Sequence, residues 1–120
     1  LKLKANTDLF DAIEMLINYK LAAAPVVDEQ NTLIGILSES DCLNAILTLT
    51  YHEEEHGGLV GDYMCKNVYS VEIDTDIIAI SKMMIAKNLH SLPIVRGETV
   101  VGQINRRDVL GAVESFTRTG

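Results

Sequence analysis

The feature of this sequence that most constrains its fold is an internal duplication. A segment that begins at Thr7 recurs 68 residues later, and the offset falls to 67 after a polar stretch that a turn accommodates. The matched pairs are Thr7/Thr75, Asp8/Asp76, Met15/Met83, Ile17/Ile85, Leu21/Leu89, Pro25/Pro93, Val27/Val95, Gly35/Gly102, Asp41/Asp108, Leu43/Leu110 and Ala45/Ala112. Such a repeat indicates one supersecondary unit used twice, with the copies packed together.

Each copy has the same predicted order of elements. A helix follows the N-cap candidates Thr7 and Thr75, each of which precedes an acidic residue, and it ends near Lys20 or Asn88. Apolar residues then predict two short strands, and a second helix begins around Ser38 or Asn105. We place the prolines of the first strand, Pro25 and Pro93, at the strand entry, where no ladder donor is needed.

These elements define the fold class and the domain organisation. We predict an α/β (α+β) protein built from two β-α-β-β-α repeats that share one core and are related by a pseudo-twofold axis. The first repeat spans residues 1–60, with a truncated lead strand and a linker, and the second spans residues 61–120. The lead strand of the second repeat is expected within residues 67–72.

Composition narrows the function. The chain has 120 residues and a net charge of −7, which opposes sequence-independent binding to nucleic acid or an anionic membrane. The longest apolar stretches are far shorter than the ~20 residues of a membrane span, and no stretch has the pattern of a signal peptide. Cys42 and Cys65 form no CxxC pair, so we interpret them as buried, reduced thiols of a cytoplasmic protein.

The repeat unit resembles a known family. A Pro-Val-Val-Asp strand, a polar turn and the string Gly35-Ile36-Leu37-Ser38-Glu39-Ser40-Asp41 resemble the cystathionine-β-synthase (CBS) domain, whose pattern is Gly, an apolar residue, any residue, Ser/Thr, two residues and Asp. Two tandem copies resemble a CBS pair, or Bateman module, of the stand-alone bacterial type. The resemblance covers nearly the whole chain.

The resemblance implies a regulatory, non-enzymatic module without a required cofactor. Its expected ligand is an adenosine derivative such as AMP, ADP or ATP, bound in clefts between the repeats, and its expected assembly is a homodimer. The residues do not indicate which enzyme or transporter it regulates. By position, the expected ligand-binding residues are Ala22, Ala23, Pro25, Ser38, Asp41, Tyr69, Ser70, His90, Ser91, Pro93, Asn105, Arg106, Arg107 and Asp108.

The chemistry of two of these residues supports the expectation independently. Ser38 stands where a strand meets a helix, and Asp41 follows one helical turn later. A carboxylate there can accept hydrogen bonds from two adjacent hydroxyl groups of a ribose, whereas helix capping alone would explain the same pair of residues. Capping does not explain the preceding Gly35, which close approach of a ligand would explain.

The two copies differ at the expected site. The second has Asn105 in place of Ser38, and Arg106 and Arg107 follow it. Arginines beside a helix N-terminus favour phosphate, so this cleft is predicted to prefer a ligand with more phosphate; solvated surface arginines are the alternative. His90 is either a ligand contact or an exposed loop histidine.

Two other hypotheses stay open. The module could be a structural or dimerising unit without a specific ligand. The string His52-Glu53-Glu54-Glu55-His56 matches the HExxH pattern of zinc hydrolases, but Gly57-Gly58 would end any helix there and no third ligand is evident, so we expect no metal site.

The helices carry more apolar side chains than one small core needs. The residues concerned are Met15, Met83, Met84, Ile46 and Leu47. We expect some of them to be buried between protomers, with burial in the protein's own core as the alternative.

Overall fold

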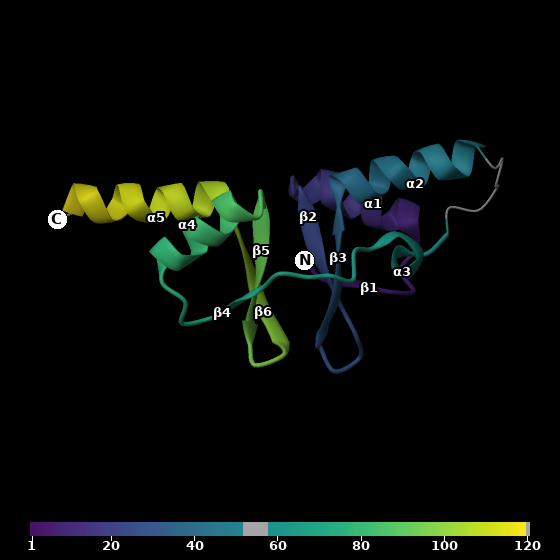
Figure 1. The fold of residues 1–120 in the computed structure, drawn as a ribbon. Coiled ribbons are helices and arrows are strands. Elements are labelled where there is room, and N and C mark those ends of the chain that lie inside the picture. The colour runs from purple at the N-terminus through teal and green to yellow at the C-terminus, as the bar shows by residue number, and fades with distance from the viewer. Residues whose placement is uncertain (52–57, 120) are drawn as a thin grey trace.

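The computed structural model describes residues 1–51 and 58–119 of the chain (Figure 1). Two β-hairpins lie next to each other at the centre, and the helices of each repeat lie on the outer side of its own hairpin. The first repeat has β1 (Leu3–Lys4), α1 (Leu9–Tyr19), β2 (Ala23–Val27), β3 (Leu33–Ser38) and α2 (Glu39–Tyr51). The second has β4 (Val71–Glu72), α4 (Ile77–Ala86), β5 (Ser91–Arg96), β6 (Thr99–Asn105) and α5 (Arg106–Thr119), and the short helix α3 (Val60–Tyr63) precedes it.

The two sheets have the same topology, which confirms the predicted α+β repeat. Their strand orders are β1-β2-β3 and β4-β5-β6, with the first pair of each sheet parallel and the second antiparallel. The residue slip between copies falls in the hairpin turns, where Asn31 and Gly97 have φ values of 66° and 64°. Only glycine and, less readily, asparagine adopt this left-handed conformation at low cost. The first copy therefore uses Asn31 in its turn, and the second uses Gly97.

Both prolines lie inside their strands, as the third residue, and not at the entry. Pro25 is opposite Ile36 in the β2–β3 register, and Pro93 is opposite Gln103 in the β5–β6 register. The Ile36 backbone N–H and carbonyl bond outward to Cys65, so this pair needs no donor from the proline. Pairing of β2 with β1 begins one residue later, at Val26, so the ladder needs no N–H at Pro25, which has none to donate.

The first helices are capped one residue later than expected. Asp8 Oδ2 accepts from the Asp11 backbone N–H at 3.1 Å, and Asp76 Oδ1 accepts from the Ala79 N–H at 2.8 Å. Thr7 instead accepts from the Lys4 N–H through its hydroxyl, which closes the preceding turn. A carboxylate adds a charge interaction with the helix dipole, and this explains why the acid and not the threonine is the cap.

The hydrophobic core consists of three clusters. One belongs to the first repeat and one to the second, and Leu3, Leu9 and Leu37 of the first and Leu92 of the second are almost fully buried. The third joins the repeats: Val27 packs with Val95, Val100 and Leu33. Met15, Met83 and Met84 pack within the core clusters of their own repeats, whereas Ile46 and Leu47 are exposed.

Backbone hydrogen bonds link the two hairpin tips. The Leu33 N–H donates to the Glu98 carbonyl at 3.1 Å, and the Val100 N–H donates to the Asn31 carbonyl at 3.0 Å. The Asn31 side-chain amide also donates to the Val100 carbonyl at 3.0 Å. These bonds hold the repeats together at one end of the hairpins, and the clefts described below lie at the strand-to-helix junctions, toward the other end.

The segment between the repeats returns across the first sheet. Within it, Val60 is fully buried in the first repeat's core, and Cys65 exchanges two backbone hydrogen bonds with Ile36, at 2.8 and 2.9 Å. The stretch 60–65 therefore packs on the first repeat, although the predicted boundary assigns most of it to the second. No helix within the described ranges is both long and apolar enough to span a bilayer.

Candidate ligand-binding clefts

A cleft of about 590 Å³ lies between the repeats, where β3 meets α2. One wall comes from the first repeat and the other from the residues that lead into β5, and the connecting segment closes one side. The lining residues are Ala22, Ala23, Ile36, Ser38, Glu39, Ser40, Asp41, Cys65, Asn67, Tyr69, Asn88, Leu89, His90, Ser91 and Leu92. We call this the larger cleft, and its volume lies within the range of small-molecule sites.

Ser38 and Asp41 form a reciprocal cap at the mouth of the larger cleft. Asp41 Oδ2 accepts from the Ser38 N–H at 2.8 Å and from the Ser38 hydroxyl at 2.9 Å, and Ser38 Oγ accepts from the Asp41 N–H at 3.1 Å. Ser38 and Asp41 therefore cap the helix and also lie at the cleft where ligand binding was expected. Among the described residues nothing donates to Asp41 Oδ1, so this half-buried carboxylate has one oxygen available to a ligand.

The equivalent place in the second repeat is a smaller cleft of about 280 Å³. Asn105 replaces the serine and still caps the helix: its Oδ1 accepts from the Asp108 N–H at 2.8 Å, and Asp108 Oδ2 accepts from its N–H at 2.9 Å. Gln103 lines this cleft and donates through its side-chain amide to the Ala23 carbonyl at 2.7 Å. Gln103 stands where the first repeat has Ile36, so its longer polar side chain crosses space that the larger cleft keeps open.

Ser91 is a polar residue of the larger cleft that lacks a partner. It is only 8% exposed, and its hydroxyl oxygen is buried without a hydrogen bond to any described residue. An unpaired buried polar group costs roughly 1–3 kcal/mol. The matching position in the first repeat is Ala23, so this hydroxyl is specific to one wall.

The structure does not bring Arg106 into the cleft of Asp108. Its Nε donates to the Leu89 carbonyl at 2.8 Å, its Nη2 donates to Asn88 Oδ1 at 3.3 Å, and its side chain lines a groove between α4 and α5. Arg106 therefore donates hydrogen bonds to two lining residues of the larger cleft, although its own side chain lines a different groove. Arg107 is exposed and lines none of the hollows described here.

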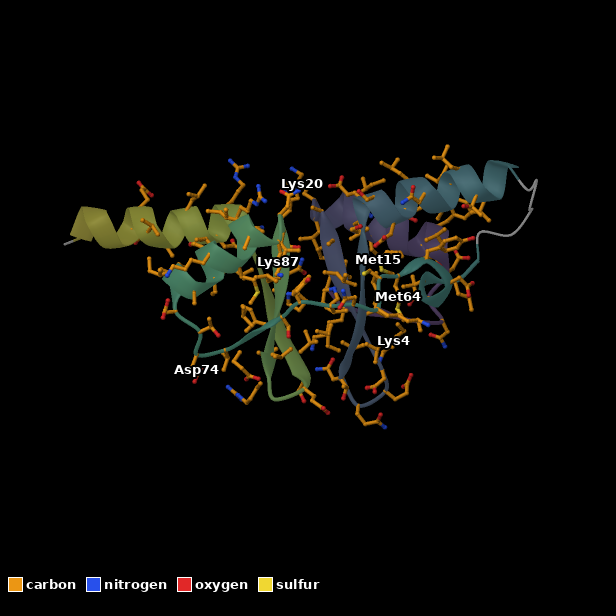
Figure 2. The ribbon with its side chains drawn as sticks, viewed as in Figure 1. Lys4, Met15, Lys20, Met64, Asp74 and Lys87 are labelled. Carbon is orange, nitrogen blue, oxygen red and sulfur yellow. The ribbon has the colours of Figure 1, made fainter. Side chains whose placement is uncertain are left out.

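Other expected residues divide into two groups. Ala22, Ala23, Ser38, Asp41, Tyr69, His90 and Ser91 meet in the larger cleft. Pro25 and Pro93 are buried inside their strands, and Ser70 lines a separate hollow near the hairpin tips with Lys66 and Glu98. The exposed Lys87, labelled in Figure 2, places its ammonium 5.4 Å from the centre of the Tyr69 ring.

Residues not predicted from the sequence also line the larger cleft. They are Ile36, Glu39, Ser40, Cys65, Asn67, Asn88, Leu89 and Leu92. Asn88 and Leu89 directly precede His90, so extending the predicted segment by two residues would have found them. Cys65 and Asn67 reach the cleft only because the connecting segment pairs with β3, and no local pattern signals that pairing.

Gly35 is explained by the chain itself and not by a ligand, contrary to the sequence-based interpretation. A methyl group on Gly35 would lie 2.6 Å from Met64 Sδ and 3.1 Å from the Cys65 carbonyl oxygen. Figure 2 shows Met64 where the connecting segment passes the first repeat. At Gly102 the nearest atom would be Ile94 Cδ1 at 3.9 Å, which is an ordinary contact.

Negative charge at the N-terminus of α2 affects the pKa of a buried thiol. The pKa of the Cys42 thiol is raised, first by burial and then by the negative charges of Asp41 and Glu39. Within the described ranges, no three His, Cys, Asp or Glu side chains gather as a metal site would require. The His52–His56 string lies outside the described residues.

The chain belongs to the CBS domain family. The family model matches residues 1–48 and 60–115, one match in each repeat. The chain is 27% identical to the uncharacterized protein MJ1225 of Methanocaldococcus jannaschii over 90% of its own length. It is 26% identical to the CBS domain-containing protein CBSX1, chloroplastic, of Arabidopsis thaliana over 98%. It spans 37% of the length of the first of these relatives and 60% of the second.

Similarity to enzymes is limited to part of their length. The chain is 32% identical to the inosine-5′-monophosphate dehydrogenase of M. jannaschii but spans only 19% of it. Among solved structures, that of CBSX2 in complex with AMP matches with a TM-score of 0.87 and 26% identity, covering 98% of this chain and 90% of that one. A CBS-domain pair of MJ0100 crystallised with 5′-methylthioadenosine and S-adenosyl-L-methionine, 22% identical, has a TM-score of 0.81 and covers 96% of this chain and 88% of that one.

Proposed function

We propose that this protein is a non-enzymatic regulatory module that binds an adenosine derivative in the larger cleft. The observation that carries the proposal is the Asp41 carboxylate. One of its oxygens is fixed by Ser38, and the other is available at a cleft of about 590 Å³. A carboxylate held in this way is suited to accept hydrogen bonds from the 2′- and 3′-hydroxyls of a ribose.

The other side chains of the larger cleft suit a purine base. Ile36, Leu92 and the Tyr69 ring offer apolar surface for a flat ring, and Asn67 and Ser91 offer hydrogen-bonding groups for its edge. CBSX2, which has the same fold, was crystallised with AMP. The smaller cleft has the same carboxylate at Asp108, but Gln103 crosses it, so we assign the ligand to the larger cleft.

A calorimetric titration with adenosine tests the proposal through Asp41→Asn. The asparagine oxygen can still accept from Ser38 and keep the helix cap, while the amide group cannot accept from a ribose hydroxyl. Because charge-assisted hydrogen bonds contribute about 1.5–3 kcal/mol each, we expect Kd to rise at least ten-fold. Asp108→Asn makes the same change at the smaller cleft and should leave Kd unaltered.

Two outcomes would contradict the proposal. Absence of any heat of binding with adenosine or AMP would favour a structural module without a ligand. Equal loss of affinity in both variants would mean that the larger cleft is not the binding site.

We also propose that the protein is a homodimer that covers the exposed apolar helix faces. Ile17 and Leu43 are exposed beside the groove between α1 and α2, and their counterparts Ile85 and Leu110 are exposed beside the groove between α4 and α5. An isologous interface joins the same surface on both copies, and a face that repeats itself within one chain suits such an interface.

A further inference from the structure

We infer that the larger cleft selects an adenosine derivative whose 5′ substituent is uncharged or positively charged, and discriminates against a polyphosphate chain. The inference rests on the proposed function, because it concerns what the same cleft accepts beyond the nucleoside. It is the opposite of the preference that Arg106 and Arg107 suggested for the other cleft, and it follows from where the charges and donors lie.

The ionised side chains that line the larger cleft are carboxylates. Glu39 and Asp41 both lie at the start of α2, and the described lining contains no lysine or arginine. His90 is the one lining group there that could become cationic. A phosphate chain at this wall would face two negative charges, and like charges a few ångströms apart repel.

Two of the cations near the cleft, Arg106 and Lys87, have other partners. The Arg106 guanidinium is bonded to the Leu89 carbonyl and to Asn88 Oδ1 on the outer side of the wall. The Lys87 ammonium lies over the Tyr69 ring. Neither side chain lines the cleft, so neutralising a phosphate would require breaking these contacts.

Most of the backbone donors at the start of α2, of the kind that usually hold phosphate, are also occupied. The Ser38 N–H donates to Asp41 Oδ2, the Asp41 N–H donates to Ser38 Oγ, and the Glu39 N–H donates to the Ala22 carbonyl at 2.9 Å. Phosphate binding at a helix N-terminus depends on N–H groups that have no partner. Of the four N–H groups of residues 38–41, those of Ser38, Glu39 and Asp41 already have a partner.

Ser91 is a lining residue of this cleft whose hydroxyl a ligand would supply with a partner once the side chain turned toward it. Its hydroxyl is more than nine-tenths buried and has no partner within the described residues, and it lies next to Leu92 on the wall opposite Asp41. A ligand whose ribose is at Asp41 would direct its base toward this wall. We therefore assign Ser91 to the nucleoside, which all adenosine derivatives share, and not to the 5′ substituent.

The test compares adenosine, AMP and ATP by calorimetry, without added divalent cations and at constant ionic strength. Wild-type protein should bind adenosine at least about ten-fold more tightly than ATP, with AMP between them. In Glu39→Gln the ratio of the ATP Kd to the adenosine Kd should fall about three-fold, because one exposed negative charge near the 5′ substituent is removed. Glu29→Gln, which removes the same charge from the β2–β3 turn, should leave the ratio unchanged.

A second variant separates the nucleoside from the phosphates. Ser91→Ala should raise the Kd of adenosine and the Kd of ATP by the same factor, about three- to ten-fold. It should not lower the Tm of the ligand-free protein, because the lost hydroxyl had no partner there. The inference would be wrong, without affecting the proposed function, if ATP bound as tightly as adenosine. It would also be wrong if Glu39→Gln left the ratio of the ATP Kd to the adenosine Kd unchanged. No binding of any of the three compounds would instead overturn both.

Discussion

Asp41 and Asp108 occupy equivalent positions, and each uses one carboxylate oxygen to cap its helix. What differs is the neighbouring side chain, which is Ile36 beside one and Gln103 beside the other. The side chain of Gln103 reaches the Ala23 carbonyl, which Ile36 has no polar group to do in the first repeat. At the scale of the residue, the two clefts share the repeated aspartate and differ in the side chains beside it.

The two repeated glycines provide a residue-scale prediction. Gly35→Ala should lower the free energy of unfolding by about 1–3 kcal/mol, because its methyl group would meet Met64 and the Cys65 carbonyl, which are held by the Cys65–Ile36 backbone bonds. Gly102→Ala is the matched control and should change stability by less than about 0.5 kcal/mol. Urea denaturation of both variants measures this, and equal effects would show that the connecting segment does not press on β3.

These residues also mark what the sequence can and cannot predict at this scale. Ser38 and Asp41 were found because the duplication repeats the acid at a fixed distance from a glycine. The reason for the glycine was not found, because Met64 and Cys65 lie about thirty residues further along the chain and reach Gly35 only through tertiary pairing. The unpaired Ser91 hydroxyl is likewise a property of packing, which no local pattern reveals.

At the scale of the element, the helices were predicted well because apolar residues recur at helical spacing and the ends are marked. Lys20 and Asn88 follow the first helices with φ values of 56° and 52°, as a left-handed helix end requires. The short helix α3 was missed because four residues show no periodicity. The lead strand before the second helix pair is shorter than expected, since only Val71–Glu72 pair with β5.

The exposed helix faces carry the element-scale prediction. Ile85 is 81% exposed beside the α4–α5 groove, so a glutamate there should cost little in the monomer but should raise the dimer dissociation constant at least about ten-fold. Ile73→Glu changes an exposed isoleucine that lies after β4, away from the helices, and serves as the control. Light scattering should give twice the 13.2 kDa chain mass for the wild type and the control. A monomeric wild type would contradict the homodimer.

At the scale of the whole molecule, the repeats are joined at the hairpin tips and, nearer the helices, by the bond from Gln103 to the Ala23 carbonyl. The bonds between Leu33 and Glu98 and between Val100 and Asn31, together with the shared valine cluster, hold one end of the molecule. The clefts lie between the repeats toward the helices, so a bound ligand would add contacts at the end that these bonds do not cover. The duplication predicted that both clefts exist, but it did not predict that Gln103 lines one of them where Ile36 lines the other.

The most direct test of the central claim, that ligand occupies the larger cleft between the repeats, is protection of the Cys65 thiol. Contrary to the interpretation from sequence, Cys65 is exposed, and it lines this cleft. Cys42 is buried beside the α1–α2 groove, and we expect it to react slowly because burial, followed by the charges of Asp41 and Glu39, raises the pKa of its thiol. With saturating adenosine we expect alkylation of Cys65 by iodoacetamide, followed by mass spectrometry, to slow at least about five-fold, because access to the thiolate is lost. Asp41→Asn should abolish the protection at the same adenosine concentration. An unchanged Cys65 rate in wild-type protein that calorimetry shows to be saturated would place the ligand elsewhere and contradict the account.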